Sequence, residues 1–448
     1  IEKFAYEELG METLELKVLE SNVHAIDFYL NNGYEAIDRI GLTNSSIGTE
    51  THLIQSEENI SDYFSVMQKN IRDTKASQAE ILTAGPSISN RELTYVSDAT
   101  MSGWNHHHSD YLSKFQEQFA DYVGAKYAIA TSSCTGALHL SLLALGIGPG
   151  DEVIVPEVTW VATASAVRYT GATPVFADVD PLTWCIDPKS VEQKITEKTK
   201  AIMPVHLYGM PAKMNEIQQI AKDYNVPVIE DAAEALGSKY KNQSCGTFGK
   251  MAALSFNGNK IITTSGGGAL VSKHKHYIDQ ARFLATQARD EAPHYQHSQI
   301  GYNYRMSNIV AGIGRGQMEV LDKRVAQRRA NNKRYRDFFA GIDGVTFQTE
   351  PVADFFSNYW LTAILIDPEL SGGISREDVR LALDAENIES RPLWKPMHMQ
   401  PVYEGTKFFG SGVCEKLFEQ GLCLPSGSNL TEAEFERIFS ALSKIFKN

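Results

Sequence analysis

The chain has 448 residues, with 42 Lys and Arg against 55 Asp and Glu, which gives a formal net charge of −13. Hydrophobic residues make up 43% and aromatic residues 10% of the chain, which excludes disorder of the whole, and the length allows about two to three domains. The acidic balance argues against nucleic-acid binding and against adhesion to anionic membranes, but a local site still suffices to bind one phosphorylated small molecule.

The sequence predicts neither a transmembrane helix nor a signal peptide, because no long apolar run and no apolar stretch near Ile1 is present. The cysteines form no C-x-x-C pair, which favours reduced thiols in a cytoplasmic protein over disulfides or a zinc site. They are Cys134, Cys185, Cys245, Cys414 and Cys423. The run His106-His107-His108 has no apparent partner ligands, so we expect no metal site.

The first 79 residues differ in pattern from the rest. Their periodicity predicts helices over 3–9, 22–32 and 61–71 and strands over 14–19 and 35–40, with a turn-rich stretch at 41–50. We therefore expect a segment over 1–56 and a linker over 57–79. Because the first residue is Ile, we also expect that the natural N-terminus has been trimmed.

Residues 80–330 alternate short strands with helices, which predicts a largely parallel sheet covered by helices on both faces. The expected strands are 127–131, 152–155, 173–177, 200–205, 227–230 and 251–256, and the expected helices are 136–145, 161–170, 214–224 and 319–341. Residues 331–448 mix a strand at 359–366 with helices at 375–385 and 431–446, which predicts a smaller α/β lobe.

Three segments carry residues suited to one kind of site. The run 131–139 joins a strand to a helix through Ser133, Cys134 and Thr135, and such a helix start offers free N–H groups to a phosphate. An apolar strand delivers Asp231 at its carboxyl end, where its carboxylate can bond to a protonated ring nitrogen. Lys260 follows a third strand in a Gly- and Ser-rich turn. Taken singly, the first two segments are better explained as capped helices. The alternative for the third, a surface lysine in a loop, is disfavoured by the presence of the other two segments in the same order.

The order of four motifs resembles that of the DegT/DnrJ/EryC1/StrS sugar aminotransferases over about residues 80–448. The motifs are Ser-x-Thr-Gly-Ala-Leu-His (133–139), Glu-Asp-Ala-Ala-Glu-Ala-Leu-Gly (230–237), Ser-Phe-Asn-Gly-Asn-Lys (255–260) and Gly-Tyr-Asn-Tyr-Arg-Met-Ser (301–307). The resemblance implies the fold type I of transferases that use pyridoxal 5′-phosphate (PLP). This fold has a mostly parallel seven-stranded sheet between helices and a smaller C-terminal α/β lobe.

The resemblance also implies roles for single residues. Lys260 would bind PLP covalently and move a proton, and Asp231 would pair with the ring nitrogen. Trp160 would stack on the ring, Glu234 would lie beside it, and Ser255 would bind the phosphate together with Cys134 and Thr135. Many relatives have Gly at the position of Cys134.

Further motif matches imply an active site shared between two subunits and a binding site for the nucleotide sugar. Asn303 would reach the phosphate of a neighbouring subunit, so we expect a homodimer with shared active sites. Two segments would contact the nucleotide sugar: Ser102, Gly103 and Trp104 in the first, and Glu389, Ser390, Arg391 and Trp394 in the second. The guanidinium of Arg391 suits a diphosphate because it donates to two oxygens at once, although a surface ion pair is the alternative.

The N-terminal segment resembles the C-terminal half of a GNAT acetyltransferase, with Asn22 matching a CoA contact and Tyr29 a proton donor. The R/Q-x-x-G-x-G/A loop that binds CoA in that family is absent from the segment. We therefore expect either the remnant of a fused acetyltransferase or an acetyltransferase that has been cut short. In either case the segment should not bind acetyl-CoA productively by itself.

The resemblance predicts transfer of an amino group from L-glutamate to carbon 4 of a nucleotide-linked keto sugar. The motifs at 255–264 and 389–398 are closest to the branch that acts on UDP-2-acetamido-2,6-dideoxy-4-hexulose, on the bacillosamine route. Three alternatives remain at this point. They are the same chemistry on a 3-keto dTDP-sugar or a pseudaminate-route sugar, a bifunctional aminotransferase–acetyltransferase, and a PLP-fold protein without catalysis.

Overall fold

The computed structural model describes residues 13–19, 35–43, 60–70, 79–406, 408 and 410–446. The chain divides into two compact units, Ile1–Ala79 and Glu80–Asn448. No helix in these described ranges is long and apolar enough to cross a membrane.

In the first unit, β1 (Thr13–Leu19) and β2 (Glu35–Thr43) both pair antiparallel with the central strand β3 (Ile60–Asn70). The strands expected at 14–19 and 35–40 are confirmed. The helix expected over 61–71 is wrong, because tertiary pairing on both sides and the β-formers Tyr63, Phe64 and Val66 favour a strand there. This strand lies inside the range expected to be a linker. The helices expected at 3–9 and 22–32, Asn22 and Tyr29 lie outside the described residues.

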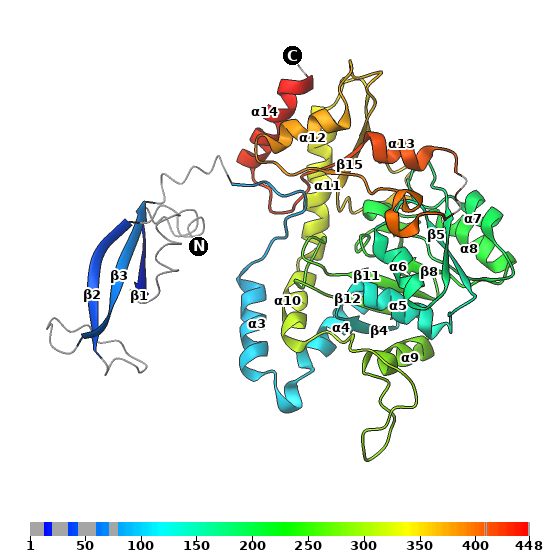
Figure 1. Cartoon of the computed structure of the whole chain (residues 1–448), viewed down its shortest axis with the longest axis horizontal. Coiled ribbons are helices and arrows are strands. Elements are labelled where there is room, and N and C mark those ends of the chain that lie inside the picture. The colour runs from blue at the N-terminus through cyan, green and yellow to red at the C-terminus, as the bar shows by residue number, and fades with distance from the viewer. Residues whose placement is uncertain are drawn as a thin grey trace. The chain divides into compact units, whose positions relative to one another are not determined.

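The second unit alternates strands and helices as the sequence predicts (Figure 1). Its elements up to residue 340 are α3 (Asn90–Ser102), α4 (Asp110–Val123), β4 (Tyr127–Thr131), α5 (Cys134–Ala144), β5 (Glu152–Pro156), α6 (Val161–Tyr169), β6 (Thr173–Ala177), α7 (Pro188–Lys194), β7 (Thr199–Ile202), α8 (Met214–Asp223), β8 (Ile229–Asp231), β9 (Lys239–Tyr240), β10 (Gln243–Ser244), β11 (Met251–Ser255), β12 (Gly268–Ser272), α9 (Lys275–Ala285), α10 (Asn308–Met318) and α11 (Leu321–Phe338).

Two sheets join edge to edge in this unit. The orders are β4-β12-β11-β8 and β6-β5-β7, and the parallel bridges Ile202↔Val228 and Val205↔Asp231 connect β7 to β8. Within the described residues, β12 alone runs against its neighbours in this seven-strand arrangement, so the expectation of a mostly parallel sheet is confirmed. The strand expected over 200–205 ends at Ile202, after which pairing continues only through the bridge at Val205.

Alternate residues of the central strands enter two separate hydrophobic clusters. Ala253 and Leu270 pack in one cluster with residues of α5, α6 and α9. Ala252 and Leu254 point the other way, into a cluster that includes residues of α4, α8 and α10. This period of two buries both faces of the sheet and leaves the carboxyl ends of its strands for a site.

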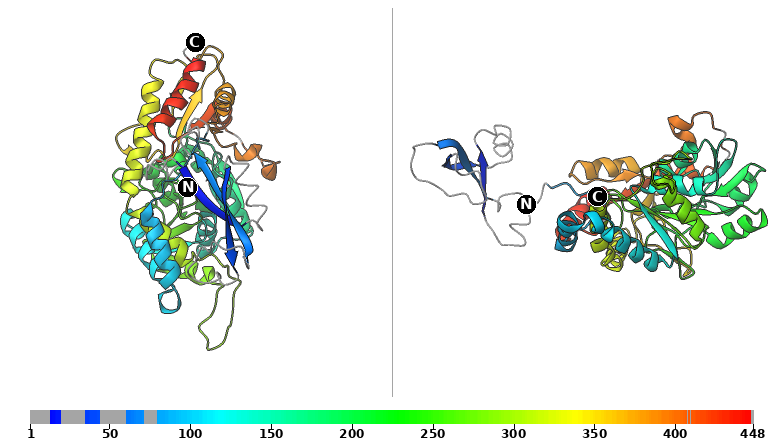
Figure 2. Two further views of the ribbon diagram at one scale, coloured as in Figure 1. Left: turned by 90° about the vertical axis from the view of Figure 1, so that its left-hand side faces the viewer. Right: turned by 90° about the horizontal axis from the view of Figure 1, so that it is seen from below.

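The C-terminal lobe has its own antiparallel sheet, in the order β13-β15-β17-β16. Its elements are β13 (Val345–Phe347), β14 (Phe355–Phe356, paired with β9), β15 (Thr362–Ile366), α12 (Arg376–Asp384), β16 (Arg391–Pro392), α13 (Val413–Gln420), β17 (Gly421–Leu424) and α14 (Glu432–Phe446). Helices α11 and α14 run close together in both views (Figures 1 and 2), joined by Tyr335 packing on Phe435. The strand expected from residue 359 begins only at Thr362, because Tyr359 has a left-handed backbone with φ of 46°.

Candidate active site

A cavity of about 680 Å³ opens at the carboxyl ends of the central strands, the edge at which open α/β sheets bind ligands. Its floor comes from residues after β4, β8 and β11, and one wall comes from the segment around β16 in the C-terminal lobe. The residues expected in the site that line it are Ser133, Cys134, Thr135, Trp160, Asp231, Glu234, Ser255, Lys260, Glu389, Arg391 and Trp394.

Asp231 ends β8 and is only 4% exposed. Thr163 Oγ1 donates to its Oδ2 at 2.8 Å, and the backbone N–H of Ala233 donates to its Oδ1 at 3.1 Å. Burial raises the pKa of Asp231, although these hydrogen bonds and the Lys260 ammonium oppose the rise. The cavity therefore contains a buried carboxylate that a cation in the cavity would stabilise.

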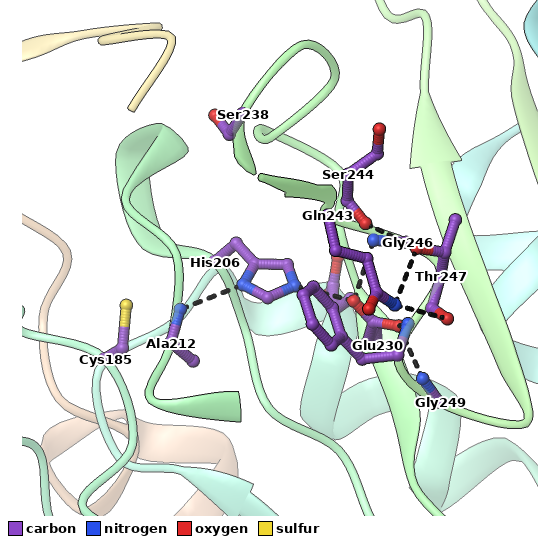
Figure 3. A network of polar contacts seen from close by, with 12 residues as sticks. Cys185, His206, Ala212, Glu230, Ser238, Gln243, Ser244, Gly246, Thr247 and Gly249 are labelled. Atoms are coloured by element: carbon purple, nitrogen blue, oxygen red, sulfur yellow. Dashed lines mark hydrogen bonds and ion pairs between the residues drawn. The ribbon is translucent and has the colours of Figure 1, made fainter. Parts of the chain in front are cut away.

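Glu230, one residue earlier, points to the opposite face of the strand and is fully buried with His206 (Figure 3). The N–H of Ala212 donates to His206 Nδ1 at 3.0 Å, so Nε2 carries the proton that it shares with Glu230 at 3.0 Å. The N–H groups of Gly246, Phe248 and Gly249 also donate to Glu230, each at 2.7 Å. His206 is therefore a hydrogen-bonded structural residue and is not among the residues that line the cavity.

Lys260 and Glu234 form an ion pair inside the cavity, with 3.2 Å between Nζ and Oε1. The N–H of Tyr208 donates to the other Glu234 oxygen at 2.7 Å. Burial is the largest influence on Glu234 and raises its pKa to about 7 in spite of the nearby ammonium. The Lys260 Nζ also lies 3.9 Å from the ring centroid of Trp360, which forms part of the cavity lining.

The loop that carries Lys260 is fixed at both ends. Strands β11 and β12 pair antiparallel from Ser255 opposite Gly268, and the N–H of Phe256 donates to the Gly267 carbonyl at 3.0 Å. Gly268 passes so close to the start of α5 that a Cβ there would lie 2.3 Å from the Cys134 nitrogen. Only glycine fits this crossing, which brings the lysine loop and the helix start to one place.

The start of α5 provides an anion site at the same edge. Ser133 caps the helix by accepting from the Gly136 N–H at 3.0 Å, and Ser255, 6% exposed, lies at the end of β11. The first turn of a helix presents N–H groups and the positive end of its dipole to an anion. Burial raises the pKa of Cys134 well above its usual value, so its thiol stays neutral and does not repel an anion there.

A model of the DegT/DnrJ/EryC1/StrS aminotransferase family matches residues 86–443. The chain belongs to this family. It is 47% identical over 377 residues to EpsN of Bacillus subtilis (strain 168), which is named as a pyridoxal phosphate-dependent aminotransferase, covering 82% of this chain and 96% of EpsN. It is 40% identical to GDP-perosamine synthase of Escherichia coli O157:H7 over 81% of this chain and 98% of that enzyme. The aminotransferase structure from Psychrobacter cryohalolentis aligns with a TM-score of 0.76 at 31% identity, covering 81% and 98%.

The chain is therefore a PLP-dependent aminotransferase that acts on nucleotide sugars. Its cavity fits the cofactor: the buried Asp231 suits a cationic ring nitrogen, the start of α5 suits the phosphate, and the Lys260 amine lies in the same space. The fold expected for this cofactor is confirmed by the structural match.

Aromatic residues line two walls of the aminotransferase cavity, one with Trp160 after β5 and one with Trp394 after β16. The ring centroids of Trp160, which is 58% exposed, and Trp394 lie 5.8 Å apart. Trp394 also packs on Tyr208 at 4.8 Å and donates its backbone N–H to the Tyr208 hydroxyl. Sequence reasoning missed Trp360 and Tyr208, because they follow no motif and reach the site only through long-range folding.

Five of the residues expected in the site do not line this cavity in the single chain. Ser102 ends α3, Gly103 follows it, and the half-exposed Trp104 donates its indole N–H to the Thr100 carbonyl. Asn303 is exposed and follows a loop that projects from the unit (Figure 1). Ser390 lines a separate pocket of about 170 Å³ that borders Glu389 and Arg391. Their roles stay predictions.

Proposed function

We propose that this aminotransferase moves the amino group of L-glutamate to carbon 4 of UDP-2-acetamido-2,6-dideoxy-4-hexulose, and that it does so as a homodimer with shared active sites. The observation that carries the chemistry is the presence of the Lys260 amine and the buried Asp231 carboxylate in one cavity. The motifs at 255–264 and 389–398 support the choice of sugar.

PLP supplies an electron sink that lets an amino group pass from a donor to the cofactor and then to a keto carbon. Asp231 holds the proton on the ring nitrogen, and Thr163 and Ala233 orient its two oxygens. Lys260 binds the cofactor, and its Nζ delivers a proton to carbon 4 of the sugar. Glu234 beside it receives or returns a proton near neutral pH, because burial raises its pKa to about 7.

The remaining residues hold the cofactor and the sugar in place. Ser133, Cys134, Thr135 and Ser255 bind the cofactor phosphate, Trp160 stacks on its ring, and Asn303 reaches the phosphate in the other subunit. Glu389, Ser390, Arg391 and Trp394, together with Ser102, Gly103 and Trp104, contact the nucleotide sugar. Arg391 is 64% exposed in its side chain and paired with Glu389, so a diphosphate can exchange for that carboxylate.

A second substrate is favoured by one observation, the 40% identity to GDP-perosamine synthase. A GDP-linked 4-keto sugar is therefore the alternative acceptor. The two differ in the nucleotide and in the group on sugar carbon 2, and both place a keto carbon beside Lys260.

The test is to incubate the purified protein with L-glutamate and a panel of UDP-, GDP- and dTDP-linked keto sugars. We expect an amino sugar from the UDP-linked acceptor, identified by mass and by NMR couplings, and 2-oxoglutarate in equal amount. The Lys260→Ala variant should lose the visible absorbance of the lysine-bound cofactor together with the activity. Amination of only the GDP-linked sugar would replace the proposed acceptor, and a fully active Lys260→Ala variant would overturn the mechanism.

A further inference from the structure

The two tryptophan walls of the cavity come from distant parts of the chain. Trp160 follows β5, and Trp394 follows β16 in the C-terminal lobe. Each has a polar residue a few positions away that does not line the cavity: Glu157 before Trp160, and His398 after Trp394. These two residues meet, although they are 241 positions apart in the sequence.

Three hydrogen bonds join the two segments at this point. Glu157 Oε1 accepts from the backbone N–H of His398 and from His398 Nδ1, both at 2.5 Å. The backbone carbonyl of Glu157 accepts from the N–H of Met397 at 2.9 Å. Because two of the three bonds use backbone N–H groups, they fix the path of the C-terminal segment and not merely one side chain.

The His398 ring is held from its other sides as well. Its Nε2 lies 3.3 Å from Glu415 Oε1 on α13, and Phe408 stacks on it with ring centroids 4.8 Å apart and planes 14° from parallel. The ring therefore has one orientation, with a carboxylate at each nitrogen and an aromatic cover.

Burial of the Glu157 carboxylate in this contact costs free energy. The Glu157 side chain is completely buried, and among the described residues its second oxygen, Oε2, has no hydrogen-bond partner. Burial raises the pKa of this carboxyl group, even with the His398 bonds acting against it. A buried polar contact with an unsatisfied oxygen adds little stability compared with apolar packing, so a role in geometry explains it better.

We propose that Glu157 and His398 are positioning residues that fix the wall carrying Arg391 and Trp394 against the wall carrying Trp160. The proposal rests on the proposed function, in which these walls bind the nucleotide sugar and the cofactor ring. A nucleotide sugar is large enough to touch both walls, whereas glutamate reacts at the Lys260 end of the cavity. Loss of the Glu157–His398 contact therefore raises the KM for the nucleotide sugar and leaves the KM for glutamate unchanged.

The experiment compares His398→Ala with His398→Asn, whose amide nitrogen can take the place of Nδ1 toward Glu157. His398→Ala keeps the two backbone bonds and removes the side-chain contacts with Glu157, Glu415 and Phe408. We expect His398→Ala to raise the KM for the keto-sugar nucleotide about tenfold and to leave the KM for glutamate and the cofactor absorbance unchanged. His398→Asn should restore most of the loss. Arg334→Ala is the matched control, because it removes the Arg334–Glu432 ion pair, and neither of these residues lines the cavity.

A second readout needs neither cofactor nor sugar. The near-ultraviolet circular dichroism of the cofactor-free protein reports the packing of Trp160 against Trp394, and Trp394→Phe gives the reference spectrum without that pair. We expect His398→Ala to shift the wild-type spectrum toward this reference and His398→Asn to stay near wild type. An unchanged spectrum in His398→Ala, or equal rises in both KM values, would overturn the positioning role. If wild type aminates no sugar of the panel, the proposed function fails while the dichroism still decides on the contact.

Discussion

The two faces of strand β8 carry adjacent carboxylates that differ in how many hydrogen-bond donors the protein gives them. Glu230 accepts from His206 and from three backbone N–H groups, so the protein itself satisfies both of its oxygens. Asp231 is also buried but accepts only from Thr163 and Ala233 in the described residues, and it faces the cavity. A structural carboxylate receives all of its hydrogen bonds from the protein, whereas a carboxylate that binds a ligand still has acceptor sites for a cation.

The alternation of a strand separates these roles within one residue. Because successive side chains point to opposite faces, the same buried segment supplies a structural anchor and a ligand-facing group. The Glu230 network also supports the site, since the N–H of His206 donates to the Asp231 carbonyl at 3.1 Å and so ties β8 to the segment that follows β7. Removing the Asp231 carboxylate should therefore lower the turnover rate, whereas removing the Glu230 carboxylate should lower the free energy of unfolding.

The largest effect is expected from Asp231→Asn. The amide cannot stabilise a positive ring nitrogen, so turnover should fall about a thousandfold in steady-state assays. The free energy of unfolding of the cofactor-free protein should be unchanged or higher, because a poorly satisfied buried charge is removed. Turnover within tenfold of wild type would show that this face of β8 is not the functional one.

Glu230→Gln should show the reverse pattern. The amide group cannot accept all four bonds of the carboxylate and places a donor against backbone N–H groups, which should lower the free energy of unfolding by about 3 kcal/mol in urea titrations. At a temperature where the variant remains folded, the KM for glutamate should stay within about twofold of wild type. A stable but inactive variant would contradict the division between the two faces.

Glu234→Gln tests the third carboxylate of this segment through pH. The folded pKa of Glu234 is raised from 4.5 to about 7, so its contribution to stability is full below pH 4.5 and is lost as the pH rises through about 7. The cofactor-free wild type should lose about 2 kcal/mol of unfolding free energy relative to Glu234→Gln between about pH 5 and about pH 8. Parallel pH curves for the two proteins would contradict this.

The smallest effect is expected from Thr163→Val, which removes one of the two donors to Asp231 and keeps the side-chain shape. Cofactor affinity should fall by about 1 kcal/mol, close to fivefold, in spectroscopic titrations. Thr170→Val, on the residue after α6, is the matched control, because the Thr170 hydroxyl bonds only near its own turn. Equal affinities in the two variants would mean that Asp231 does not depend on its hydroxyl partner.

The sequence predicted the polar residues on the floor of the cavity but not the residues that pack around its walls. Asp231 ends β8, Lys260 lies in the loop after β11, and parallel strands bring their carboxyl ends together, so local patterns sufficed to group them. Trp360, Tyr208 and the Glu157–His398 contact depend on the C-terminal lobe folding back over the sheet, and no spacing in the sequence encodes that approach.

The main error in secondary structure has a related cause. Residues 61–71 have a mixed pattern that fits a helix by periodicity, and only their pairing with β1 and β2 makes them the centre of a sheet. Similarly, residues 359–361 of the strand expected from 359 are irregular backbone ahead of β15, since Tyr359 adopts a positive φ that alternation cannot reveal. Local patterns fail where distant segments decide the backbone.

The reversed direction of β12 has a consequence for how this enzyme tolerates change. A parallel neighbour would require a long crossover, with one end of the lysine-bearing segment on the far side of the sheet. Because β12 returns at once, both ends of residues 256–267 are tied to adjacent strands at the same edge. We therefore expect an insertion within residues 256–267 to displace the Lys260 amine more than an insertion at the opposite ends of these strands.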